Sequence, residues 1–265
     1  MALTLLPLIS ILLANPAATQ PESPAPAPAP APAPPAPPAE GLVEVFPSVR
    51  VDRAARVVEF DSTVIAGLAD PNKKLYLEVL ACPRDSKEHE SLVMTLVKPS
   101  QVHAAMLLAG FKPGRPVTWP EPKPGEKAPA PTPPEGDAVA VTFAWTDPAT
   151  KQNRTASPLE WVVNAKTNER ASALNAGFVF AGSVIIKRAN PAPGQPPALP
   201  PERYDADSAG TLIGLASFGS ETIAWTQPFS PESSIAEPVW IADRERVPPL
   251  GTKVVVRLAP DENSK

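Results

Sequence analysis

The chain has 265 residues, of which 43% are hydrophobic and 39 are proline, and its net charge at pH 7 is −4. Nucleic-acid binding depends on clustered lysine and arginine residues that neutralise phosphate, so this slight acidity without a long basic run argues against a nucleic-acid partner. Most of the prolines lie in three stretches, which leaves roughly 190 residues able to pack, enough for a single domain.

The first predicted element is an export signal at residues 1–18. Leucine and isoleucine dominate positions 3–13, and no charged residue interrupts them. An apolar run of about twelve residues is too short to span a bilayer but matches the central region of a signal peptide. Small residues suit cleavage near Ala18, although no lysine or arginine precedes the apolar run. We therefore expect an exported protein, periplasmic or extracellular, with no membrane span after cleavage.

Residues 19–41 are predicted to form a disordered Pro/Ala-rich linker, since alanine and proline alternate through most of this stretch. Each proline fixes its own φ and biases the preceding residue toward extended geometry. Such a segment favours polyproline II and acts as a spacer. A ligand for a proline-binding module is the alternative.

One globular domain is predicted for residues 42–260. Its clearest strand is 75–82, where Leu75, Leu77 and Val79 alternate onto one face. Residues 157–163 suit either a short helix or a strand, with Trp161 as a core anchor. Further strands are predicted at 56–60, 64–66, 92–97, 139–145, 177–187, 211–218 and 253–258.

A short helix is predicted after Ser100, which suits the N-cap position. Val102, Ala105 and Met106 recur at helical spacing, and Gly110 ends the pattern. Pro-rich surface loops are predicted at about 113–136 and 190–201. The predicted fold class is therefore α+β: a mostly antiparallel β-sheet domain with one or two short helices and long Pro-rich surface loops.

Five short motifs, taken together and in order, resemble the YdjY domain family of exported bacterial proteins, especially its planctomycete forms. The resemblance spans about residues 45–260 and implies an exported or envelope-associated protein, with no assigned reaction and no cofactor. The motifs are KEHES at 87–91, VHAA at 102–105, GFKPG at 110–114, VFAGS at 179–183 and PPLGT at 248–252.

Both histidines of the chain lie in these motifs, and they define a candidate site. If 75–82 and 89–97 form a hairpin that turns at Asp85 and Ser86, Cys82 stands opposite His89. A helix folded over this hairpin would add His103. The candidate site residues are Cys82, His89, Glu90, Ser91 and His103, with Glu78 on the same face.

Two kinds of chemistry would suit this candidate site. A histidine can take the proton of Cys82 and leave a thiolate nucleophile. Alternatively, Cys82, His89 and His103 with a carboxylate could bind a divalent metal such as zinc, although their spacing matches no established zinc motif. The simpler interpretation gives these side chains structural roles: the histidines bond to nearby backbone, and Glu88 and Glu90 are solvent-facing partners for Lys87 or Arg84.

The leading functional hypothesis is an exported, envelope-associated binding or scaffolding module without catalysis and without a cofactor. Its partner would be an envelope protein or a small ligand. The alternative is a metal-binding or Cys/His-dependent enzyme centred on Cys82, His89 and His103. A small-ligand carrier would instead need a pocket lined by several of the five tryptophans, Trp119, Trp145, Trp161, Trp225 and Trp240.

Overall fold

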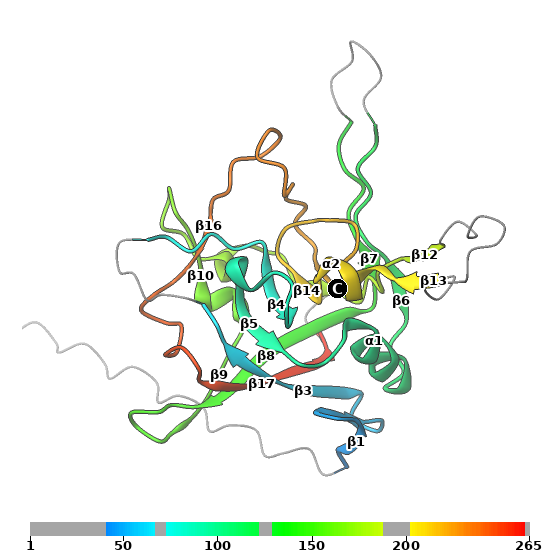
Figure 1. The fold of residues 1–265 in the computed structure, drawn as a ribbon, viewed down its shortest axis with the longest axis vertical. Coiled ribbons are helices and arrows are strands. Elements are labelled where there is room, and N and C mark those ends of the chain that lie inside the picture. Colours follow the sequence, from blue (N-terminus) through cyan, green and yellow to red (C-terminus); the bar gives the residue numbers. More distant parts are fainter. Residues whose placement is uncertain (1–40, 67–72, 122–128, 188–201, 263–265) are drawn as a thin grey trace, which may run out of the picture. The chain divides into compact units, whose positions relative to one another are not determined.

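The computed structural model describes residues 41–66, 73–121, 129–187 and 202–262 (Figure 1). The predicted signal segment 1–18 and nearly all of the linker 19–41 lie outside these ranges. So do residues 190–201 of one Pro-rich loop and residues 122–128 of the other.

The domain is built mainly from strands that join one large sheet. The strands of this sheet are β1 (Val43–Phe46), β2 (Val49–Asp52), β3 (Val57–Val64), β4 (Val79–Pro83), β5 (Ser91–Thr95), β8 (Ala138–Thr146), β9 (Asn153–Ala156), β11 (Phe178–Val179), β14 (Ile213–Gly214), β15 (Ile223–Trp225) and β17 (Lys253–Pro260). Their order is β1-β2-β3-β17-β8-β11-β15-β14-β4-β5, and β9 pairs with β8.

The predicted α+β class is wrong, because the sheet closes into an eight-stranded barrel. Closure occurs at the end of β3, where Thr63 pairs with Met94 and Val64 pairs with Val93 of β5. β1 and β2 extend the sheet beyond β3 and stand outside the ring. The closing contact joins segments about thirty residues apart, so no local hydrophobic pattern predicts it.

Side chains fill the barrel, as expected for a ring of about eight strands. Phe60, Phe143 and Val256 are fully buried at neighbouring positions of β3, β8 and β17. Trp161 and Trp225 are also buried, and each makes an edge-to-face contact with another tryptophan. Trp161, Trp225 and Trp240 therefore belong to the hydrophobic core, and half-buried Trp145 packs against it.

Two short helices complete the described fold, α1 (Pro99–Leu108) and α2 (Asp205–Ala209). The predicted helix is present, but its N-cap is Lys98 and not Ser100. Proline suits the first helical position because it lacks the N–H that would go unpaired there. Gly110 follows the helix at φ +83°, a left-handed conformation that glycine adopts readily.

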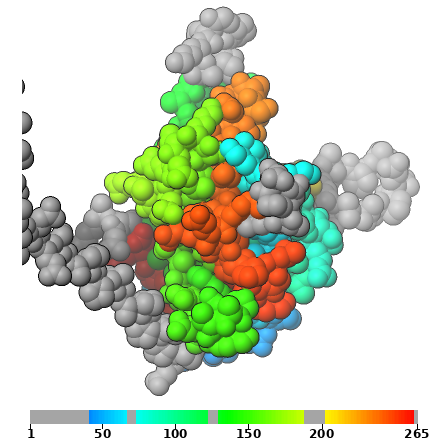
Figure 2. Space-filling model, turned by 90° about the vertical axis from the view of Figure 1, so that its left-hand side faces the viewer, coloured from blue at the N-terminus to red at the C-terminus, as the bar shows by residue number. Residues whose placement is uncertain are grey.

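Three smaller strand pairs lie outside the large sheet. The Pro-rich loop near 113–136 begins and ends as the pair β6 (Pro113–Arg115) and β7 (Glu135–Gly136), and β12 (Ile185–Lys187) pairs with β13 (Glu202–Tyr204). The third pair, β10 (Val162–Asn164) with β16 (Trp240–Ala242), lies on the face shown in Figure 2.

The ambiguous region 157–163 contains both predicted alternatives. The 3₁₀ turn η2 (Pro158–Trp161) leads directly into β10, and the side chain of Ser157 caps the turn by accepting from the Leu159 N–H. None of the helices in the described part of the chain is long and apolar enough to cross a membrane.

Candidate functional site

The predicted hairpin that placed Cys82 opposite His89 does not form. β4 and β5 run parallel, and Cys82 is opposite Met94. Residues 84–90 carry the chain back to the start of β4 through the 3₁₀ turn η1 (Glu88–Glu90). Such a short connection between adjacent parallel strands is unusual, since parallel pairs normally need a longer crossover.

Local hydrogen bonds hold this tight return in place. The carboxylate of Glu88 accepts from the backbone N–H groups of Asp85 and Ser86. The hydroxyl of Ser86 donates to the carbonyl of Pro83 at 2.6 Å. Asp85 adopts φ +60°, a conformation that suits a turn. Asp85 and Ser86 therefore lie in a turn, as predicted. The chain then runs back to the start of β4 and turns again, so that β5 runs parallel to β4.

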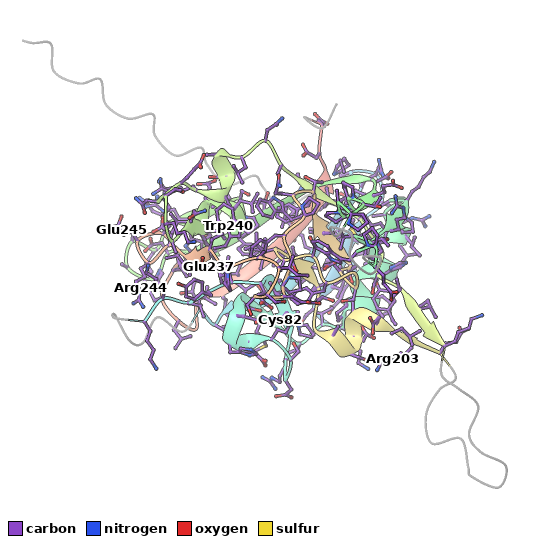
Figure 3. The ribbon with its side chains drawn as sticks, turned by 90° about the horizontal axis from the view of Figure 1, so that it is seen from above. Cys82, Arg203, Glu237, Trp240, Arg244 and Glu245 are labelled. Atoms are coloured by element: carbon purple, nitrogen blue, oxygen red, sulfur yellow. The ribbon has the colours of Figure 1, made fainter. Side chains whose placement is uncertain are left out.

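Cys82 lies inside the fold, on strand β4 (Figure 3). It has no solvent exposure. Burial raises the pKa of its thiol, against smaller opposing contributions from Ser91 and Ser86. A buried neutral thiol is a weak nucleophile, so its surroundings suit a small packed side chain.

Glu90 belongs to a half-buried ionic cluster with Lys87 and Glu78. The Lys87 ammonium contacts the Glu90 carboxylate and lies 3.7 Å from the Glu78 carboxylate. It also lies 4.3 Å above the ring of Phe218. Burial, followed by the nearby charge of Glu90, raises the pKa of Glu78. This cluster joins the return loop after β4 to the loop that precedes β15.

His89 and Ser91 flank Glu90 but face different surroundings. The side chain of His89 is 77% exposed, with its Nε2 3.7 Å from a Glu90 oxygen. Ser91 is fully buried and donates to the carbonyl of Lys87 at 2.6 Å. His89 is therefore a surface side chain, whereas Ser91 holds the return loop against β5.

His103 lies in a separate cluster with β13. Its Nδ1 is 3.0 Å from the Tyr204 hydroxyl, which is 3.0 Å from the Thr222 hydroxyl. Burial lowers the pKa of His103, against a smaller opposing contribution from the Gly182 backbone. His103 also packs edge-to-face on Phe180. These contacts dock the β12–β13 pair on α1, with Arg203 visible on β13 in Figure 3.

The structure therefore divides the predicted site among three places. Cys82 contacts Ser91, and Glu90 contacts His89, but His103 pairs with Tyr204. Within the described ranges, no group of three His, Cys, Asp or Glu side chains is arranged to hold a metal ion. The metal and nucleophile hypotheses stay predictions.

A groove of about 900 Å³ lies on another part of the domain. Its floor crosses five neighbouring strands, β9, β8, β17, β3 and β5. Val255 stands between Ala144 and Asp61, and Thr63 stands between Lys253 and Met94. At about 4.8 Å between strands, five strands span roughly 19 Å. The groove thus runs across the strands, which suits an extended ligand.

The charges that line the groove are mostly positive. Arg84, Arg154 and Lys253 line it, and none of them makes an ion pair with the described residues. The only acidic residue in the lining, Asp61, is paired with Arg50 at 2.7 Å. The groove therefore carries an excess of positive charge on a chain whose net charge is negative.

Sequence reasoning missed this groove because its parts are far apart in the chain. Arg84 and Lys253 are far apart in the sequence. They line the same groove because β3 pairs with both β17 and β5. The sequence offers one local indication: Ala140, Thr142 and Ala144, which are small or polar, alternate with the large apolar residues of 139–145. That pattern predicts a solvent-facing strand but not a groove.

The fold and the groove define the class: a closed β-barrel domain with an elongated cationic groove on its surface. The sequence model of the YdjY domain family matches residues 49–259. The chain therefore belongs to the YdjY domain family, as the sequence motifs indicated. Comparisons with curated proteins and with solved structures gave no match.

Proposed function

We propose that this protein is an exported, envelope-associated binding module that holds an extended ligand in the groove. The observation that carries the proposal is the groove itself, about 900 Å³ in volume and open across five strands. Ligand sites in proteins are typically concave and of this size. The barrel beneath supplies a rigid floor, since Val254 and Val256 of β17 are buried in the core.

Residue chemistry also favours binding over catalysis. Cys82, the only cysteine, is fully buried with a raised thiol pKa. His103 is occupied by Tyr204, and His89 faces solvent. The groove contains neither histidine nor cysteine. Its polar side chains suit recognition by hydrogen bonds and charge.

Export is supported by the sequence alone. An uncharged apolar run at 3–13 is followed by small residues and then by the Pro/Ala-rich stretch. This order matches a signal segment followed by a spacer. The spacer would hold the binding domain away from whatever the N-terminus contacts.

The groove can be tested by filling it. Thr146 is an exposed lining residue near the end of β8, so Thr146→Trp places a bulky ring in the groove without disturbing the core. Binding of the purified protein to polygalacturonate, dextran and polyglutamate is measured by affinity electrophoresis. We expect at least one polymer to retard the wild type but not Thr146→Trp.

Val43→Trp is the matched control, because Val43 is 63% exposed on β1 and does not line the groove. It should bind as the wild type does, and both variants should keep the wild-type melting temperature. Failure of all three polymers to bind, or equal binding by Thr146→Trp, would contradict the proposal.

A further inference from the structure

The arginines that line the groove differ from most others in the domain. Arg50, Arg56 and Arg257 each pair with a carboxylate within 3 Å. Arg84 and Arg154 have no such partner among the residues that the structure describes, although acidic residues outnumber basic ones in the chain. Their charges are therefore not neutralised by a direct contact with a protein carboxylate.

Arg154 contributes positive charge near the groove from the other face of β9, because it stands opposite Trp145, which packs on Trp161 in the core. Its Nε is buried without a hydrogen-bond acceptor among the described residues, as are the Nε atoms of the ion-paired Arg170 and Arg203. The Asp147 carboxylate feels Arg154 electrostatically but forms no ion pair with it. The cations that face a ligand in the groove are therefore Arg84 and Lys253.

Lys253 provides a charge at the centre of the groove floor. Its ammonium donates to the Thr63 hydroxyl at 3.1 Å, which fixes the side chain beside β3 without neutralising it. Arg84 is exposed, and its backbone N–H donates to the carbonyl of Thr95. Arg84 follows β4 and Lys253 begins β17, so the two cations are spread along the groove.

The direction of the groove distinguishes between classes of extended ligand. A peptide that binds by strand addition lies along a free sheet edge and forms a ladder of main-chain hydrogen bonds. This groove crosses the strands, and those at its centre, β8, β17 and β3, are already paired on both sides. Its accessible polar groups are side chains, including Ser48, Thr146 and Asn153, which suit a ligand rich in hydroxyl groups.

We infer that the ligand is an acidic polysaccharide, a chain of sugars bearing carboxylate groups. Its carboxylates pair with Arg84 and Lys253, and its hydroxyl groups bond to the serine, threonine and asparagine side chains of the groove. Arginine suits this task because its planar guanidinium can bind a carboxylate through two hydrogen bonds. This inference rests on the proposed binding role of the groove.

The test compares polygalacturonate with neutral dextran and with polyglutamate, using the full chain and calorimetry. Polygalacturonate should bind most tightly, and its affinity should fall as salt rises, because salt screens exposed charges. The double variant Arg84→Gln/Lys253→Gln should bind it on the order of tenfold more weakly, since two charge-assisted contacts are lost. Arg53→Gln/Lys187→Gln changes the net charge equally outside the groove and should bind normally.

The outcomes separate this inference from the proposed function. Tighter binding of polyglutamate would overturn the polysaccharide assignment in favour of an acidic peptide. Binding of dextran that resists the double charge variant but is lost in Thr146→Trp would leave the groove as a binding site and overturn its preference for acidic ligands. Absence of any groove-dependent binding would overturn both.

Discussion

Glu221 has the most deeply buried carboxyl group among the described residues, with 1% exposure. One of its oxygens accepts from the backbone N–H groups of Phe218 and Gly219, and the other has no hydrogen-bond partner in the described structure. Burial raises the pKa of Glu221, against smaller opposing contributions from these backbone groups. The neutral acid therefore suits this position better than the carboxylate.

This raised pKa predicts a pH dependence of stability. The folded state binds the Glu221 proton more tightly than the unfolded state does. The resulting stabilisation is complete below the unfolded pKa and is lost as pH rises through the folded pKa. Glu221→Gln cannot ionise, so the free energy of unfolding of the wild type should fall relative to this variant as pH rises above about 4.5. Urea denaturation of both proteins between pH 4 and pH 8 measures this, and a constant difference would contradict it.

The surroundings of single side chains were harder to predict from the sequence than the positions of strands and helices. The sequence identifies Cys82, His89 and His103 as chemically capable side chains, but their surroundings depend on pairing that it does not specify. A parallel β4–β5 pair moved Cys82 away from the predicted partner. Tyr204, about one hundred positions from His103, is that histidine's actual partner. The burial of Glu221 was not predicted, because an acidic residue in a loop rich in glycine and serine normally faces solvent.

At the scale of elements, glycines allow the smaller strand pairs to lie close to the barrel. Gly136 of β7 has φ +145°, and a Cβ there would lie 2.1 Å from the Phe180 carbonyl oxygen. Gly114 of the paired strand donates its N–H to the same carbonyl at 2.9 Å. The Pro-rich composition predicted a surface loop here, whereas the described ends of this segment are paired strands that bond to Phe180, just beyond β11.

This close approach predicts a large difference between two glycine substitutions. Gly251 has φ +84° but open space around its Cα, so Gly251→Ala should cost only about 1 kcal/mol of backbone strain. Gly136→Ala adds a clash with backbone and should cost a further ~1–3 kcal/mol. Chemical denaturation of both variants measures the difference. Equal free energies of unfolding would show that the segment does not pack as described.

Element boundaries follow the same logic. The sequence located the strands at 139–145 and 253–258 because apolar residues recur at every second position, and it located α1 from apolar residues at helical spacing followed by Gly110. It predicted one strand at 177–187, whereas the chain leaves the barrel after β11 through Gly182 at φ +84° and Ser183 at φ +55°. At this exit a Cβ on Gly182 would lie 2.7 Å from the Cβ of Pro113, so glycine is required there. The sequence did not specify where the chain leaves the barrel.

At the scale of the whole molecule, the barrel joins the two ends of the domain. β17, the last strand, lies between β3 near the start and β8 in the middle. Val256 of β17 is fully buried and opposes Phe60 on one side and Phe143 on the other. Contacts so distant in sequence form only when the whole chain is in place, which is why local patterns predicted strands but not the closed ring.

Closure predicts that the domain unfolds as one unit. If β17 leaves, β3 and β8 lose their shared neighbour and the ring opens, so partial unfolding is disfavoured. Tryptophan fluorescence, which reports on buried Trp161 and Trp225, and far-ultraviolet circular dichroism should therefore give the same urea midpoint. Val256→Ala removes two core methyl groups and should lower the free energy of unfolding by roughly 2 kcal/mol. Because one cooperative unit responds, both signals should shift together in this variant; a shift in only one would show that part of the barrel unfolds separately.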